Sequence, residues 1–182
     1  NLTKVTFAID IDNNDALATL NGLESLSQVG GLILQNGRLI DISALNQLEQ
    51  VSYTFTVKNE YNLENLIDFN NLISLSGDVL IASNRLLQSI TGFNNIPSFR
   101  SFEVYDNEAL TSITGFNQLE TISGDFILGS SPTYKWGENP VLTDISGLNS
   151  LTTVSQNFYV GDNTVLPNLN GLQNLGTIGK DV

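Results

Sequence analysis

The sequence predicts a β-rich solenoid in which about seven successive coils each contribute one parallel strand. Two observations lead to this fold class. Segments with apolar residues at alternate positions recur along the chain, and each is followed by a longer segment with an apolar residue at every third position. Both patterns return together, mostly every 22 to 24 residues, which indicates a repeat architecture and not a fold around one central core.

Each repeat opens with alternating apolar residues, which are typical of a half-buried β-strand. The paired apolar positions are Ile9 and Ile11, Leu32 and Leu34, Phe55 and Val57, Val79 and Ile81, Phe102 and Val104, Phe126 and Leu128, and Phe158 and Val160. Strands stacked about 4.8 Å apart form a parallel sheet along one side of a solenoid, with these residues pointing inward. The alternate residues then line the outer face, where a ligand can reach them.

A leucine after each strand fixes the position of the repeat. These anchors are Leu17, Leu39, Leu63, Leu87, Leu110, Leu142 and Leu166, spaced by 22, 24, 24, 23, 32 and 24 residues. Three residues before an anchor lie Asn14, Asn36, Asn84, Asn107, Asn139 and Asn163, whereas Asn59 lies four residues before the third anchor. We expect these asparagine side chains to satisfy backbone groups of neighbouring coils and so to form an internal ladder.

The segment after each anchor is apolar at a strict spacing of three. In the fifth copy the positions are Leu110, Ile113, Phe116, Leu119 and Ile122, and every other copy is apolar at the same places. An α-helix alternates spacings of three and four, so the pattern instead predicts short strands, bends and a tight helical turn around 115–117 and its equivalents. Glycines precede the middle position in five copies, where a bend would need their conformational freedom.

Copies of the repeat cover nearly the whole chain, which predicts a single domain over residues 1–182. Leu2 and Val5 match the last positions of a preceding repeat, and residues 179–182 match the entry to another strand. Because solenoids need polar caps over their end coils, we expect that the chain belongs to a larger protein or that adjoining segments supply the caps. A stable, monodisperse 182-residue chain in solution would count against this expectation.

Composition argues against several classes of site and partner. The chain has no Cys and no His, so we expect no disulfide framework, no thiolate or imidazole metal site and no cofactor. Nineteen acidic against seven basic residues give a formal charge of −12, which disfavours nucleic acid and acidic membrane surfaces as partners. No apolar run approaches the roughly 18 residues that span a bilayer, so membrane insertion by this segment is not expected.

The run of strand, Asn, L-x-x-I-x-G-F/L-x-x-L-x-x-I and Gly-Asp before the next strand resembles the receptor L-domain branch of leucine-rich-repeat proteins. The best-matching stretches are 77–84 (GDVLIASN), 110–126 and 142–160, and the pattern covers essentially the whole chain. The resemblance implies a right-handed solenoid, exposure outside the cell and a protein, peptide or glycan ligand. The receptor members carry Cys-rich flanks that are missing here, which favours a microbial surface protein over an animal receptor. No functional residue is shared by motif.

The candidate ligand-binding residues come from outer strand positions and from one insertion. Ten residues separate Leu128 from Asn139, and insertions in solenoids often fall on the binding face. The candidates are Thr56, Glu103, Tyr105 and Tyr159 on the strands, and Tyr134, Lys135 and Trp136 in the 129–138 loop. Aromatic side chains on a rigid surface suit the recognition of a protein or a sugar. The alternative is that the strand residues are ordinary exposed ones and that Trp136 packs over a local gap.

Two kinds of chemical site fit the sequence less well. The acidic and amide residues of 10–15 offer the oxygen ligands that Ca²⁺ prefers, but their order is not that of an EF-hand, and a solvated acidic edge is the simpler interpretation. Asp10 and Glu103 lie on strands four coils apart, about 19 Å, which is too far for the paired carboxylates of glycoside hydrolysis. Without His, and with few Lys, no base activates a Ser or Thr nucleophile, so an enzyme is not expected.

The function that these features favour is that of a non-catalytic binding or adhesion module, secreted or on the surface of a microbial cell. It would recognise a protein or a carbohydrate through its exposed sheet and the 129–138 loop. The alternative is a structural spacer or stalk in a large surface protein, with no face that binds a ligand. Replacing outward aromatic residues separates the two, because only a binding module loses adhesion.

Overall fold

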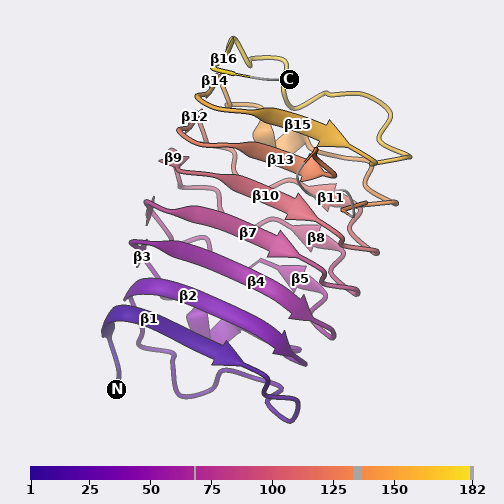
Figure 1. Cartoon of the computed structure of the whole chain (residues 1–182). Coiled ribbons are helices and arrows are strands. Elements are labelled where there is room, and N and C mark those ends of the chain that lie inside the picture. The colour runs from indigo at the N-terminus through magenta and orange to yellow at the C-terminus, as the bar shows by residue number, and fades with distance from the viewer. Residues whose placement is uncertain (68, 133–136, 181–182) are drawn as a thin grey trace.

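Over the described residues, the chain folds into a stack of about seven coils whose long strands lie side by side in one parallel sheet (Figure 1). The structure is a computed structural model and describes residues 1–67, 69–132 and 137–180. The long strands are β1 (Lys4–Asp12), β2 (Gln28–Gly37), β4 (Thr54–Glu60), β7 (Asp78–Ala82), β10 (Phe102–Tyr105), β13 (Phe126–Gly129) and β15 (Phe158–Gly161). Their order in the sheet follows the chain, so the predicted β-solenoid is confirmed.

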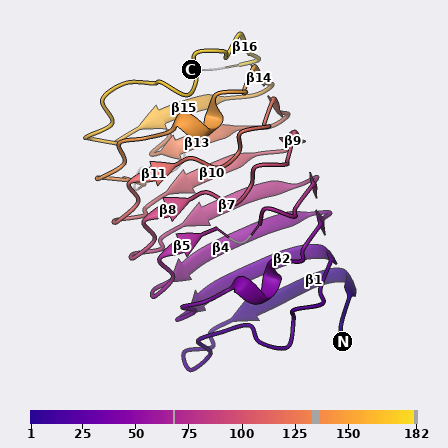
Figure 2. The ribbon, with the colours of Figure 1, turned by 180° about the vertical axis from the view of Figure 1, so that it is seen from behind.

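Two further sides of the coils are built from strands of two residues. One side holds β3 (Gln50–Val51), β6 (Ser74–Leu75), β9 (Ser98–Phe99), β12 (Thr121–Ile122), β14 (Thr153–Val154) and β16 (Thr177–Ile178). The other holds β5 (Asn65–Leu66), β8 (Ser89–Ile90) and β11 (Ser112–Ile113), which are labelled in Figure 2, where the molecule is turned by 180°. Strand β2 serves two sides, because its start pairs with β3 and its end with β4. The short strands predicted from the spacing of three are therefore present beside the long ones.

The interior is one continuous apolar core, because inward residues of all three sides stack coil upon coil. From the second to the sixth coil, the anchor leucine and the four apolar residues after it are at most 3% exposed. Phe69, Phe93 and Phe116 form a stacked column with ring centroids 5.1 and 4.8 Å apart. Phe102 meets Phe116 edge to face at 5.4 Å, a geometry that aromatic pairs prefer. The core predicted from the repeat is confirmed in these coils.

The glycines at the corner that follows β5, β8, β11 and their equivalents have different roles in different coils. Gly22 and Gly171 have φ angles of +107° and +113°, so conformational freedom is needed there, as predicted. Gly92, Gly115 and Gly147 do not have positive φ, which corrects the prediction for these coils. At these three positions an added Cβ would collide with the backbone of the preceding coil, so glycine is needed for close approach.

The helical turn that we predicted around 115–117 and its equivalents is confirmed in two coils and is wrong at 115–117 itself, where the Leu119 N–H donates to Phe116 O at 2.9 Å in a simple turn. Short 3₁₀ helices form at the equivalent corner of two other coils, as η1 (Ser43–Leu45) and η2 (Ser146–Leu148). In both, the side chain of an aspartate, Asp41 or Asp144, accepts the N–H of the first helical residue at 2.8 Å. The 115–117 corner has no acid at this position, and such a side-chain bond favours the tight turn.

A row of asparagines links the coils inside the corner where the long strands end. Asn84, Asn107, Asn139 and Asn163 contact one another in sequence along this row. Asn107 Nδ2 donates to Ile81 O at 3.0 Å and to Asn139 Oδ1 at 3.3 Å, and its Oδ1 accepts the Asn84 N–H at 3.1 Å. The predicted ladder is confirmed for these four residues, and it supplies buried backbone groups with partners.

Three asparagines that we predicted for the ladder lie outside it. Asn14 Nδ2 donates to Asp12 O at 2.9 Å within its own coil. Asn36 has a φ of +54°, and its Nδ2 donates to Asp12 Oδ1 at 2.8 Å. Asn59 has the same φ and donates to Asn36 Oδ1 at 2.7 Å. The ladder position in these coils belongs to the next residue, Gly37 or Glu60, which pair with each other across β2 and β4. The prediction for Asn36 is wrong because Gly37 lies only two residues before its anchor, so the second coil is one residue shorter there. In the third coil the usual position, three residues before the anchor, is held by Glu60 and not by an asparagine.

Glu60 is the only charged residue among those described whose side chain is completely buried. Its carboxyl group occupies the space that Gly37 leaves, since a Cβ on Gly37 would lie 2.8 Å from Oε1. Oε2 accepts the Leu39 N–H at 3.0 Å, whereas Oε1 has no partner among the described residues. Burial raises the pKa of Glu60, and the Leu39 N–H opposes this shift only in part.

Glu60→Gln is expected to stabilise the chain at neutral pH. The pKa of Glu60 is raised in the folded state. Protonated Glu60 therefore contributes to the free energy of unfolding in full below the unfolded-state pKa, and this contribution is lost as pH rises through the folded-state pKa. Glutamine still accepts from Leu39 and carries no charge. The free energy of unfolding should therefore exceed that of the wild type by about 1 kcal/mol or more at pH 8, with a smaller difference at pH 4.

Urea denaturation at the two pH values measures this difference between Glu60→Gln and the wild type. Glu120→Gln is the control, because Glu120 is exposed and its removal changes the same formal charge. That variant should show no comparable gain at pH 8. A Glu60→Gln chain that is less stable than the wild type by the same amount at both pH values would contradict the prediction.

Candidate functional site

The candidate site is the outer face of the long-strand sheet, where the register aligns one residue from each strand. This outer row runs Asp10, Ile33, Thr56, Leu80, Glu103, Ile127 and Tyr159 from β1 to β15. Thr56, Glu103 and Tyr159 therefore share the row, each separated from the next by one strand. Tyr105 lies two residues after Glu103 on β10 and pairs with Ala82. The sheet thus brings the four predicted strand residues to one face.

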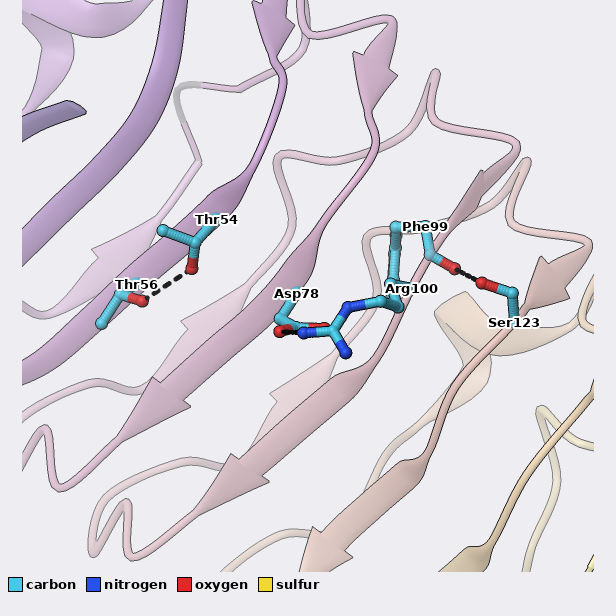
Figure 3. Close-up of polar contacts among 6 residues, drawn as sticks. All are labelled: Thr54, Thr56, Asp78, Phe99, Arg100 and Ser123. Atoms are coloured by element: carbon cyan, nitrogen blue, oxygen red, sulfur yellow. Dashed lines mark hydrogen bonds and ion pairs between the residues drawn. The ribbon is translucent and has the colours of Figure 1, made fainter. Parts of the chain in front are cut away.

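The middle of the outer row mixes apolar and polar groups. Leu80 and Ile127 flank Glu103 on the neighbouring strands, and Ile127 is only 5% exposed although it points away from the core. On β4, Thr56 Oγ1 lies 3.2 Å from Thr54 Oγ1 and shares a hydrogen bond with it (Figure 3). A half-buried apolar centre with a few hydrogen-bonding groups is the arrangement that binding surfaces commonly use.

An ion pair and one further carboxylate affect Glu103 from the side where the long strands begin. Arg100, in the turn before β10, pairs with Asp78 at the start of β7 (Figure 3). Burial is the main cause that raises the pKa of Glu103; Asp78 and Asp125 raise it further, and the Arg100 guanidinium lowers it. The Glu103 carboxyl therefore keeps its proton to a higher pH than an ordinary glutamate, and while protonated it can donate a hydrogen bond to a ligand.

The acidic residues of the face are spread along the stack. Four strand steps separate Asp10 from Glu103 in the register, or about 19 Å at the usual strand spacing. That distance exceeds the separation of paired carboxylates in glycosidases. In the 10–15 segment, Asp12 Oδ1 accepts from the amides of Asn13 and Asn36 at 2.7 and 2.8 Å. Among the residues that the structure describes, no group of three or more His, Cys, Asp or Glu side chains is arranged to hold a metal ion.

The other predicted site residues, Tyr134, Lys135 and Trp136, lie outside the residues that the structure describes. The described ends of their loop still show where it leaves and rejoins the sheet. The loop begins at the end of β13, between β10 and the last long strand, β15. The described residues on either side of the gap place the two ends of the loop relative to the outer row.

Both described ends of the loop lie against neighbouring long strands. At its start, the Ser130 N–H donates to Gly161 O at 3.0 Å, which ties the loop to the end of β15. At its end, a Cβ on Gly137 would lie 2.9 Å from Tyr105 Cβ and 2.9 Å from Gly129 O, so the backbone passes directly against the Tyr105 side chain. Tyr105 and the returning loop are consequently neighbours at one edge of the outer face.

Sequence reasoning did not group Asp78, Arg100 and Asp125 with the predicted site. A signal for the two acids was present, because each follows the glycine that precedes a long strand, and equal repeat positions stack in space. Arg100 had no such signal. It takes the position that Gly77 and Gly124 hold in the neighbouring repeats, so the repeat gives no reason to expect a basic residue there.

Comparison with protein families, with curated proteins and with solved structures found no match to this chain. In the part of the chain that the structure describes, no helix is long and apolar enough to cross a membrane. The class that the fold defines is a β-solenoid repeat protein, and its outer row is the surface that combines half-buried apolar, acidic and aromatic groups.

Proposed function

We propose that the chain is a non-catalytic binding module of the receptor L-domain type, that is, a right-handed leucine-rich-repeat solenoid. It acts at the surface of a microbial cell or after secretion, and it recognises a protein or a carbohydrate. The repeat type is supported by the sequence of stretches such as 110–126 and by the parallel stack of long strands. The −12 charge and the absence of Cys are consistent with this class.

The observation that carries the proposal is the in-register outer row that joins Thr56, Glu103 and Tyr159. Its strands are paired on both sides in the middle of the sheet, and the asparagine ladder ties their ends together. Side chains on such a support lose little conformational freedom when a ligand binds, which favours affinity. The neighbouring Tyr105 adds an aromatic contact at the edge where the loop returns.

Tyr105→Ala and Tyr159→Ala are expected to weaken ligand binding about tenfold or more each, since buried aromatic contacts dominate recognition energies. The ligand is first found by screening the wild-type chain on protein and glycan arrays. Binding of the variants is then measured by surface plasmon resonance, together with Trp136→Ala in the loop. Tyr53→Ala is the control, because Tyr53 is exposed at the corner before β4 and does not belong to the outer row.

The two functions give different results in this experiment. A wild-type chain that binds nothing on either array favours the structural spacer. A ligand whose affinity is unchanged in the Tyr105 and Tyr159 variants places recognition elsewhere on the chain and contradicts the role of the outer row. Loss of binding in Tyr53→Ala alone would also contradict the role of the outer row.

A further inference from the structure

Two arginines flank a tyrosine at the corner where the second, third and fourth long strands end. Arg38 follows β2, Tyr61 follows β4 and Arg85 follows β7. Together with Asn62 and Leu86 they line one surface hollow. Tyr61 and Leu86 are 44% and 42% exposed, so an aromatic and an apolar side chain of the lining are open to solvent. This corner hollow is separate from the outer row.

Each arginine is oriented by one ion pair with the coil beyond it. Arg38 Nε lies 3.5 Å from Asp15 Oδ1 of the first coil, and Arg85 Nε lies 3.4 Å from Glu108 Oε2 of the fifth coil. Both contacts use Nε, and among the described residues no partner is found for the terminal nitrogens of either side chain. The donors that suit a bidentate contact with a carboxylate are therefore still available.

The corner hollow is a basic place on an acidic protein. Two of the seven basic residues, Arg38 and Arg85, line the hollow and no acidic residue among those described does, although the formal charge of the chain is −12. Along the stack, Asp15 and Glu108 lie one coil beyond the arginines. A long polyanion that crossed the corner would meet these carboxylates, whereas a short ligand with one negative charge would not.

We propose that the corner hollow binds an acidic sugar residue with one carboxylate, such as a hexuronic acid. The arginines lie two coil steps apart, about 10 Å, which leaves space for one sugar ring between them. The carboxylate pairs with a guanidinium group, the ring packs on Tyr61, and the Asn62 amide can donate to or accept from hydroxyl groups. An acidic peptide fits less well, because its further carboxylates would approach Asp15 or Glu108.

Titration of the ¹⁵N-labelled full chain with sodium glucuronate, followed by NMR, tests the proposal. Saturable shifts with a millimolar dissociation constant are expected at Arg38, Tyr61 and Arg85, and none with glucose, which lacks the charge. Arg38→Gln and Arg85→Gln should each weaken binding about fivefold or more. Lys4→Gln is the control, since it removes a positive charge at the exposed start of β1, outside the lining of the hollow, and it should bind as the wild type does.

The same spectra show whether each variant is folded, and the arginines of the hollow are exposed, so folding is expected to be unaffected. Glucuronate shifts that do not saturate, or an affinity unchanged in both Arg38→Gln and Arg85→Gln, would overturn the proposal. Tighter binding of a triglutamate peptide than of glucuronate would overturn it as well. None of these results bears on the outer row, whose variants are measured separately.

Discussion

Asn107→Ala is expected to lower the free energy of unfolding by about 3 kcal/mol or more. Asn107 is completely buried, and its side chain serves two coils at once. Its Oδ1 accepts the Asn84 N–H at 3.1 Å, and its Nδ2 donates to Ile81 O and to Tyr105 O, both at 3.0 Å. Alanine removes all of these bonds and leaves buried backbone groups without partners, each of which costs about 1–3 kcal/mol.

Urea denaturation followed by circular dichroism measures the loss in Asn107→Ala. Asn117→Ala is the control, because Asn117 is exposed at a corner. Its amide donates to Thr114 O at 3.2 Å within its own turn and to Asn94 Oδ1 of the preceding coil, both at exposed sites, so no buried group loses its partner. We expect that variant to stay within about 0.5 kcal/mol of the wild type. If both variants have the same stability, the ladder does not contribute what its hydrogen bonds suggest.

The stack of coils could be predicted because its core repeats the same contacts. An apolar residue at each of five positions, as from Leu110 to Ile122, is buried in every inner coil. The alternation at Phe102 and Val104 likewise fixed which strand residues point inward, since side chains on a strand alternate between faces. Where every coil has two similar neighbours, position in the repeat is sufficient to place a residue.

Exceptions to the repeat could not be predicted from position alone. The spacing predicts Asn36 in the ladder. Because the second coil is one residue shorter before its anchor, Asn36 instead lies at the corner with positive φ, and Gly37 takes the ladder position. The gap is filled by Glu60 from the next coil, a contact that depends on three-dimensional complementarity. A local pattern cannot indicate that the side chain of one repeat completes another.

The candidate site was predictable to a similar extent. Alternation and register placed Thr56 and Glu103 on the same outward row. The sequence did not indicate that Arg100 reaches Asp78, because a long side chain can cross between coils in several directions. Tyr134, Lys135 and Trp136 stay predictions.

Gly77→Ala is expected to lower the free energy of unfolding by about 3 kcal/mol, because no movement of a side chain can make space for the new methyl group. A Cβ on Gly77 would overlap the carbonyl oxygen of Tyr53 in the preceding coil and lie 3.0 Å from its Cα. The obstacle is backbone, and the Gly77 carbonyl also accepts the Arg100 N–H of the following coil at 2.9 Å. Moving the chain away from Tyr53 therefore strains the contacts on both sides.

Gly176→Ala is the matched control for this effect, since a Cβ there would come no closer than 4.0 Å to Asn174 O and Thr152 O and its φ is not left-handed. We expect that variant to be as stable as the wild type or slightly more stable, because alanine restricts the unfolded chain. Thermal unfolding compares the two directly. If Gly77→Ala and Gly176→Ala have the same melting temperature, close approach of the coils is not the reason why glycine is needed at position 77. A lower melting temperature for Gly77→Ala alone means that the spacing between β4 and β7, which aligns Thr56 with Leu80 in the outer row, depends on the missing side chain.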